Sequence, residues 1–268
     1  MNKKRAFLVG LIFFILAIVS LAPATLISQY LADKSAGRLL LSNAQGTIWQ
    51  GSADVALAGE AQQLGVALAN LSEVNISASN IGQLDWQIQA TRLLVGQFKV
   101  VFSLNNSAPA NLTLSNNQIK LEQLDINLPA AAIASLMPSL SVAQLGGQIH
   151  ISTPSFTAEA LNTAELNFTG QVQIAWLQAR SALSAINPLG QYQTLINGQN
   201  QQLIIKLNTI DGALILQGDG SLNPTSGLVF SGVASAQTSQ KQALAPLLHV
   251  LGNETVAGSG EFKINFNH

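Results

Sequence analysis

Apolar and polar residues alternate in run after run of this chain, and this pattern limits the fold more than any other feature. Leu84, Trp86 and Ile88 are separated by Asp85 and Gln87. The same alternation returns in residues 98–104, 149–152, 203–207 and 262–266. Successive side chains of a strand point to opposite faces, so each run predicts a strand with one apolar and one polar face. We therefore expect a mainly β protein built around a largely antiparallel sheet.

Turn signals separate several of these runs. Asn116-Asn117 and Asp211-Gly212 each stand between two alternating segments, which predicts two hairpins. Another turn or bulge is expected between two strands near residues 46–51.

Two or three short helices interrupt the strands. Pro129 and Pro138 bracket an alanine-rich segment, which predicts a helix over residues 129–137. Leucines at helical spacing predict a second helix over residues 244–251, with Ser239 as a plausible N-cap and Pro246 delaying or kinking it. Residues 179–186 are a candidate for a third.

The chain begins with a basic triplet, Lys3-Lys4-Arg5, followed by residues 6–27, none of which carries a charge. At helical rise these 22 residues cover about 33 Å, enough for a hydrocarbon core of roughly 30 Å. We expect a single transmembrane helix over 6–27, with residues 1–5 in the cytoplasm and 28–268 across the membrane as a β-rich domain.

A cleaved signal peptide is the alternative. Ala22-Pro23-Ala24 resembles a small-residue cleavage site. The apolar run before it is longer than the usual core of about 7–15 residues, which favours an uncleaved anchor. Both interpretations export the rest of the chain.

The composition argues against several partners. Charged residues make up 9% of the chain and the net charge is −1, so we expect no nucleic-acid partner. Cysteine is absent, which excludes disulfides and thiolate metal sites.

Catalytic motifs are also missing. His150, His249 and His268 have no metal-ligand spacing, and neither a phosphate-binding glycine loop nor a G-x-S-x-G elbow occurs. We expect no enzyme, and no catalytic residue, cofactor or metal.

Each of the three tryptophans, Trp49, Trp86 and Trp176, lies in an alternating run. Packing within the sheet explains them, and a partner-binding surface is the alternative. The segments around Trp86 and Trp176 resemble one another, which suggests two β-rich halves; coincidence among similar strands is the other explanation.

One hexapeptide, Gly46-Thr47-Ile48-Trp49-Gln50-Gly51, resembles the G-T-[IVL]-W-x-G signature of type II secretion system protein N. Further blocks of that family are matched in order by residues 84–96, Leu128-Pro129-Ala130, residues 189–192 and residues 247–252.

This resemblance implies an accessory, non-catalytic subunit of the bacterial type II secretion system, which exports folded proteins from the periplasm. It implies a place in the inner membrane and contacts with other subunits of the system, through a scaffold role. The family is also similar to AsmA-like proteins with a long, twisted sheet and an apolar concave face, so a lipid- or hydrophobe-binding groove is the alternative. The expected structural or interaction residues are Gly46, Thr47, Ile48, Trp49, Gly51, Trp86 and Trp176.

Overall fold

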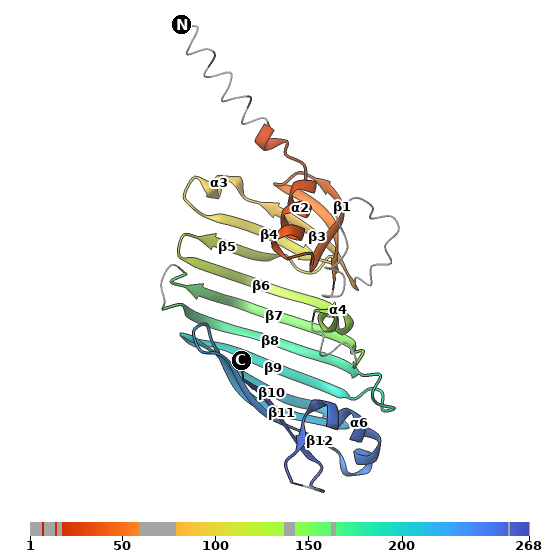
Figure 1. The fold of residues 1–268 in the computed structure, drawn as a ribbon. Helices are drawn as coiled ribbons and strands as arrows, with labels where there is room; N and C mark the ends of the chain where they lie inside the picture. The colour runs from red at the N-terminus through yellow and green to blue at the C-terminus, as the bar shows by residue number, and fades with distance from the viewer. Residues whose placement is uncertain are drawn as a thin grey trace.

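The computed structural model describes residues 7, 14, 18–58, 79–136, 143–161, 165–256 and 258–267. Within these residues the strands form one 14-stranded sheet (Figure 1). The strands follow one another in sequence order, except that β14 lies between β12 and β13, and neighbouring strands pair antiparallel. The prediction of a mainly β protein with a large antiparallel sheet and few helices is confirmed.

The bounds of the elements follow the alternating runs of the sequence. The strands are β1 (Leu39–Gly46), β2 (Gln50–Leu57), β3 (Ser79–Ile88), β4 (Phe98–Leu104), β5 (Ala110–Ser115), β6 (Gln118–Pro129), β7 (Gly146–Glu159), β8 (Asn167–Arg180), β9 (Gly190–Asn200), β10 (Gln202–Gly212), β11 (Leu214–Asn223), β12 (Gly227–Ala236), β13 (Asn253–Glu254) and β14 (Glu261–Asn267). The helices are α2 (Thr25–Lys34), α3 (Ala90–Leu93), α4 (Ala130–Ser135), the 3-10 turn η2 (Thr238–Gln240) and α6 (Lys241–Leu251).

The register of the pairs gathers apolar side chains on one face of the sheet. Trp86 lies opposite Phe102, and Trp176 lies opposite Tyr192 with the ring centroids 5.5 Å apart. Partners across an antiparallel pair share a face, so the rows connect from strand to strand. We call this surface the apolar face; it includes Leu41, Val55, Leu84, Phe102, Leu112, Leu121, Ile151, Ile174, Ile196, Ile205, Leu216, Phe230 and Phe266.

The opposite face carries the polar members of each run. His150 and Asp125 face each other there with their side-chain atoms 2.9 Å apart, and Lys120 pairs with Glu122 at 2.7 Å. Gln171 belongs to the same polar surface, where its amide donates to Asn197. The charged groups of the central strands therefore stay in water, away from the apolar face.

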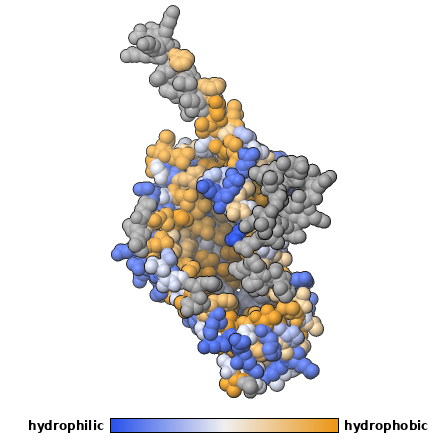
Figure 2. Space-filling model, viewed as in Figure 1, coloured by the Kyte–Doolittle hydropathy of each residue, from blue (hydrophilic) through white to orange (hydrophobic). Residues whose placement is uncertain are grey.

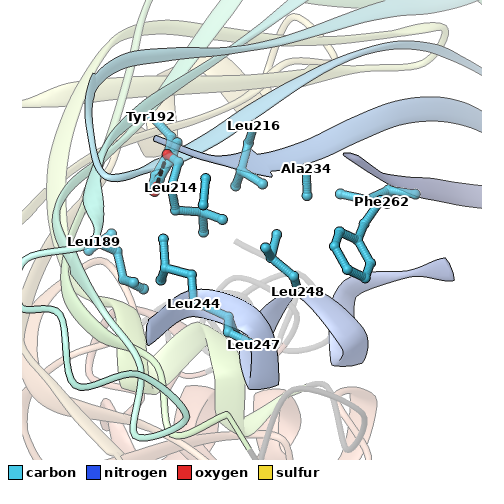
Figure 3. Packing of buried hydrophobic residues seen from close by; sticks show 12 residues of the cluster. Leu189, Tyr192, Leu214, Leu216, Ala234, Leu244, Leu247, Leu248 and Phe262 are labelled. Atoms are coloured by element: carbon cyan, nitrogen blue, oxygen red, sulfur yellow. Dashed lines mark hydrogen bonds between the residues drawn. The ribbon is translucent and has the colours of Figure 1, made fainter. Parts of the chain in front are cut away.

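Buried clusters close the two ends of the apolar face. At the C-terminal end α6 packs Leu244, Leu247 and Leu248 against Leu214 and Phe262, and these five side chains are at most 4% exposed (Figure 3). At the N-terminal end Ala24, Ala53 and Trp86 form a smaller cluster.

Between these clusters several apolar side chains of the central strands are only half-buried, as at Leu112, Leu121 and Ile174. Figure 2 shows this as an orange hollow along the molecule. The described part of the chain therefore leaves the middle of the apolar face open to solvent.

Both predicted hairpins are confirmed. Asn116-Asn117 joins β5 to β6, and the Asp211-Gly212 pair lies where β10 turns into β11. The alanine-rich helix is also present as α4, which begins at Ala130; residues 137–142 lie outside the described residues.

The predicted helix over residues 179–186 is wrong. Ala179 and Arg180 complete β8, and turns follow. The Ser181 hydroxyl donates to the Ala143 carbonyl at 2.7 Å and accepts from the Leu183 amide at 3.2 Å. This side-chain bonding competes with the helical ladder, as serine often does.

The expected N-cap of the C-terminal helix is also wrong. Ser239 lies inside η2, and α6 begins at Lys241 with Gln240 before it. Pro246 stands within α6, so the proline neither stops the helix nor sets its start.

The predicted span over residues 6–27 lies partly outside the described residues, which include 7, 14 and 18–27 of it. Among the residues that are described, no helix combines the length and the hydropathy needed to cross a bilayer. At its C-terminal end the expectation of one helix up to residue 27 is wrong: residues 18–20 are helical, the chain turns at residues 21–24, and α2 starts at Thr25. Pro23 interrupts the helix because it forms a β-bridge with Thr47.

We predict that Leu244→Ala lowers the free energy of unfolding by about 2–5 kcal/mol, because it leaves a cavity where the side chain is fully buried. Val250→Ala, on the exposed side of the same helix, serves as the matched control and should change it by less than about 0.5 kcal/mol. Urea unfolding followed by circular dichroism measures both. Equal effects of the two substitutions would contradict the packing of α6.

Candidate functional site

The turn between β1 and β2 contains the sequence signature and is built around the side chain of Thr47. The Thr47 hydroxyl accepts hydrogen bonds from the amides of Trp49 at 3.2 Å and Gln50 at 3.3 Å. The Thr47 amide donates to the Gln50 carbonyl at 2.9 Å. These bonds satisfy the turn internally, so its shape is set by its own residues.

Neither glycine of the signature has room for a side chain. Gly46 has φ +87°, and a Cβ there would come 2.5 Å from the Gln50 carbonyl oxygen. A Cβ at Gly51 would come 2.6 Å from the ring of Trp86. The indole therefore occupies the space that a side chain at position 51 would need.

Both signature-region tryptophans use the indole nitrogen to fix a neighbouring backbone. Trp49 Nε1 donates to the carbonyl of Val19 at 2.8 Å. Trp86 Nε1 donates to the carbonyl of Ile48 at 3.2 Å. The first bond reaches back 30 residues to the segment before α2. The second holds the turn itself against β3.

Backbone hydrogen bonds complete the contact with the N-terminal segment. The Ile48 amide donates to the carbonyl of Ala22 at 2.9 Å, and the Ala24 amide donates to the carbonyl of Gly46 at 3.2 Å. Pro23 forms a β-bridge to the turn between them. We call residues 46–51 together with Trp86 the leader clamp, because they hold residues 19–24 against the edge of the sheet.

Six of the seven residues singled out in the sequence therefore meet at one place. Trp176 does not: it lies on β8, where its indole nitrogen donates to the Gly146 carbonyl at 2.9 Å. It packs against the C-terminal cluster instead.

A second feature of the structure is an apolar cavity of about 550 Å³ at the C-terminal end of the apolar face. It lies between α6, the segment at residues 143–145 and the strands from β8 to β14. Its lining includes Leu145, Trp176, Leu207, Phe230, Leu251 and Phe266. The volume lies within the range of about 300–1,000 Å³ typical of small-molecule sites.

Two polar side chains near this cavity, Tyr192 and Ser181, are already engaged. The Tyr192 hydroxyl donates to the Leu214 carbonyl at 3.0 Å (Figure 3), and burial raises the pKa of Tyr192 above its ordinary value, so the hydroxyl stays neutral. Ser181, which lines the cavity, donates to the Ala143 carbonyl. The cavity therefore offers room chiefly for apolar groups.

Among the charged groups elsewhere, Glu254 is held by a turn near the C-terminus. The backbone amide of Gly260 donates to Glu254, and the amides of Gly260 and Gly258 lower the pKa of that exposed carboxyl. No cluster of three or more His, Cys, Asp or Glu that could hold a metal occurs in the part of the chain that the structure describes.

No sequence pattern indicates Val19 and Ala22 as clamp partners, because both take part through backbone carbonyls. The cavity was also missed: alternation predicts an apolar face but not where the sheet and a helix enclose space.

Within the described residues, fold and site define a class: a protein built on one sheet with a partly open apolar face, held to its own N-terminal segment by a glycine–tryptophan turn. Residues 37–265 match the family model described as type II secretion system (T2SS), protein N, and the chain belongs to this family. The resemblance carried by the signature is thereby confirmed. Comparison of the chain with curated proteins and with solved structures found no match in either set.

We predict that Gly51→Ala destabilises the protein by about 1–3 kcal/mol, because the added methyl group collides with the Trp86 ring. Gly146→Ala is the matched control: its Cβ would meet only Arg180, at an ordinary 3.4 Å. Chemical unfolding of both variants in detergent measures the difference. A Gly51 variant as stable as the control would show that the clamp tolerates a side chain.

Proposed function

We propose that the protein is a non-catalytic scaffold of the type II secretion system, fixed in the inner membrane by its leader and reaching into the periplasm with its sheet. Family membership supports a role in this secretion system. The single observation that carries the scaffold role is the leader clamp, because it joins the N-terminal segment rigidly to the sheet through hydrogen bonds on both sides of Pro23.

The dimensions of the sheet suit a spacer. From β1 to β14 the sheet extends about 60 Å at the usual distance between strands. Each internal strand is hydrogen-bonded on both sides, so the plate resists bending more than a chain of linked domains would. A partner bound near α6 is thereby held at a set distance from the leader.

The hydrogen bonds of the leader clamp also concern the question of whether the N-terminal leader is cleaved after Ala24. Removing the chain up to Ala24 would take away the carbonyls of Val19 and Ala22, which accept from Trp49 and Ile48. Ala24 itself is only 1% exposed, because the folded protein packs it in the N-terminal cluster with Ala53 and Trp86. Both points support an uncleaved leader with its basic start in the cytoplasm.

The contacts with other subunits are the remaining part of the proposal. The polar face offers side-chain amides and separated charges, and the edges of the sheet offer backbone groups to which a partner strand can pair. Subunits of the same secretion system are the expected partners.

A second candidate function is binding of a lipid or another hydrophobe. The cavity next to α6 favours it, since 550 Å³ of apolar space with engaged polar groups suits neither water nor a packed core. Native mass spectrometry of the purified protein tests this candidate. A bound apolar molecule that Leu207→Trp displaces would support it, and a ligand-free mass after mild extraction would count against it.

We predict that deleting the protein lowers the fraction of secreted proteins that leaves the periplasm, and that the intact chain restores it. Cell fractionation with quantitative blotting of an exported hydrolase measures the effect. The control is a periplasmic protein that is not exported, whose location should not change. Unchanged secretion in the deletion strain would contradict a role in export under the conditions used.

We also predict that the leader is retained in the mature protein. Intact-mass measurement of protein extracted from membranes should give a chain that still contains residues 1–24. A mass corresponding to a chain that begins after Ala24 would show cleavage and would remove the proposed anchor.

A further inference from the structure

We propose that the end of the sheet next to the leader clamp rests on the surface of the lipid bilayer, through an interfacial patch formed by Leu21, Leu26 and Tyr30 with Lys34 at its rim. This inference rests on the proposed anchoring and adds to it a defined contact surface and a direction for the sheet.

The patch consists of large apolar side chains that the fold leaves in solvent. Leu21 is 73% exposed, Leu26 50% and Tyr30 61%. A shallow apolar groove on the same surface is lined by Ile18 and Leu21 together with Leu26. Ala24, in the same short segment, is buried in the N-terminal cluster, so the chain separates one packed side from one exposed apolar side. Figure 2 shows the orange surface passing from the leader onto this end of the molecule.

Along the exposed side of α2 the side chains pass from apolar through aromatic to cationic, which is also the order of preference from the hydrocarbon to the water at a membrane interface. Leu26, Tyr30 and Lys34 are four residues apart, so they share one face of the helix. The Lys34 Nζ lies 5.8 Å from the centre of the Tyr30 ring. An aliphatic, an aromatic and a cationic side chain thus follow one another over about 12 Å of helix. This distance carries them from the edge of the hydrocarbon through a headgroup layer of roughly 6 Å.

The length of the leader argues for a bilayer rather than for a soluble partner. The sequence has 15 uncharged residues, 6–20, before the turn at residues 21–24, and a helix of that length would cover about 22 Å. A hydrocarbon core of roughly 30 Å is longer than this, so the anchor draws the domain toward the membrane. The exposed leucines that follow the span supply the missing apolar surface.

The leader clamp makes this patch part of the sheet. Trp49 holds the Val19 carbonyl and Ile48 holds that of Ala22, so the segment that bears Leu21 cannot turn independently of β1 and β2. Because α2 and α6 lie at opposite ends of the sheet (Figure 1), a membrane-bound patch directs the α6 end and its cavity away from the bilayer.

The experiment uses the absence of cysteine, which lets a single introduced thiol carry a fluorescent label without background. Single-cysteine variants of the full chain are made at Phe14 in the leader, at Leu26 and Tyr30 in the patch, and at Ile210 on β10. Ile210 is 57% exposed and serves as the matched apolar control at a distance from the patch. Each labelled protein is reconstituted into bilayers that contain lipids with a nitroxide in the headgroup region or in the acyl chain.

We expect a loss of fluorescence at Leu26 and Tyr30 from headgroup nitroxide, a loss at Phe14 from acyl-chain nitroxide, and none at Ile210. Iodide added to the water should quench Ile210 far more than Leu26. Circular dichroism confirms that each variant is folded.

Quenching by lipid at Phe14 but not at Leu26 or Tyr30 would overturn the interfacial patch while leaving the anchor intact. No quenching by lipid at any site would overturn the anchor and the patch together. Protection of Leu26 from iodide without quenching by lipid would show that protein covers the patch, which also overturns the proposal.

Discussion

The structure depends on the antiparallel register that keeps every apolar row on the same side of the sheet. A slip of one residue in any pair would move a whole row to the other face. The irregular positions preserve this order: Gln123 has φ +56°, and beyond it Leu124 continues the row begun by Leu121. The register therefore gives the sheet one apolar face, and the two terminal helices use the ends of that face to pack. The proposal of a hydrophobe-binding cavity depends on the described residues leaving part of the apolar face uncovered between these helices.

The leader clamp likewise depends on how closely backbone and side chains fit together. Gly51 leaves room for the Trp86 indole, Gly46 brings the backbone close to the Gln50 carbonyl, and the indoles of Trp49 and Trp86 donate to backbone carbonyls rather than to side chains. This arrangement explains why a signature of six residues combines small residues with a large one. It also links the part of the chain expected in the membrane to the part that the family assigns to secretion.

Strand content and the hairpin at Asn116-Asn117 could be predicted, because each depends on neighbours in sequence or on alternation. The resemblance named Trp86 and the signature as residues of interest, but their contact depends on the pairing of β2 with β3. Other features could not. The segment after Arg180 has helical spacing, but hydrogen bonds from Ser181 decide against a helix. The role of Val19 lies in a backbone carbonyl, which every residue possesses. The cavity depends on where α6 crosses the curved sheet, and no local pattern encodes that.

The sequential order of the strands has a consequence for how the protein is made. Among the described strands, each from β2 to β12 pairs with the strand synthesised just before it; most of these connections are short, and the longest runs from Leu57 of β2 to Ser79 of β3. A polypeptide made from its N-terminus can therefore extend the sheet one strand at a time. Each new strand finds a template already in place and leaves a fresh edge for its successor. Assembly then joins strands that are neighbours in sequence until β14 pairs with β12 past α6 and β13, and each unpaired edge is soon covered by the next strand.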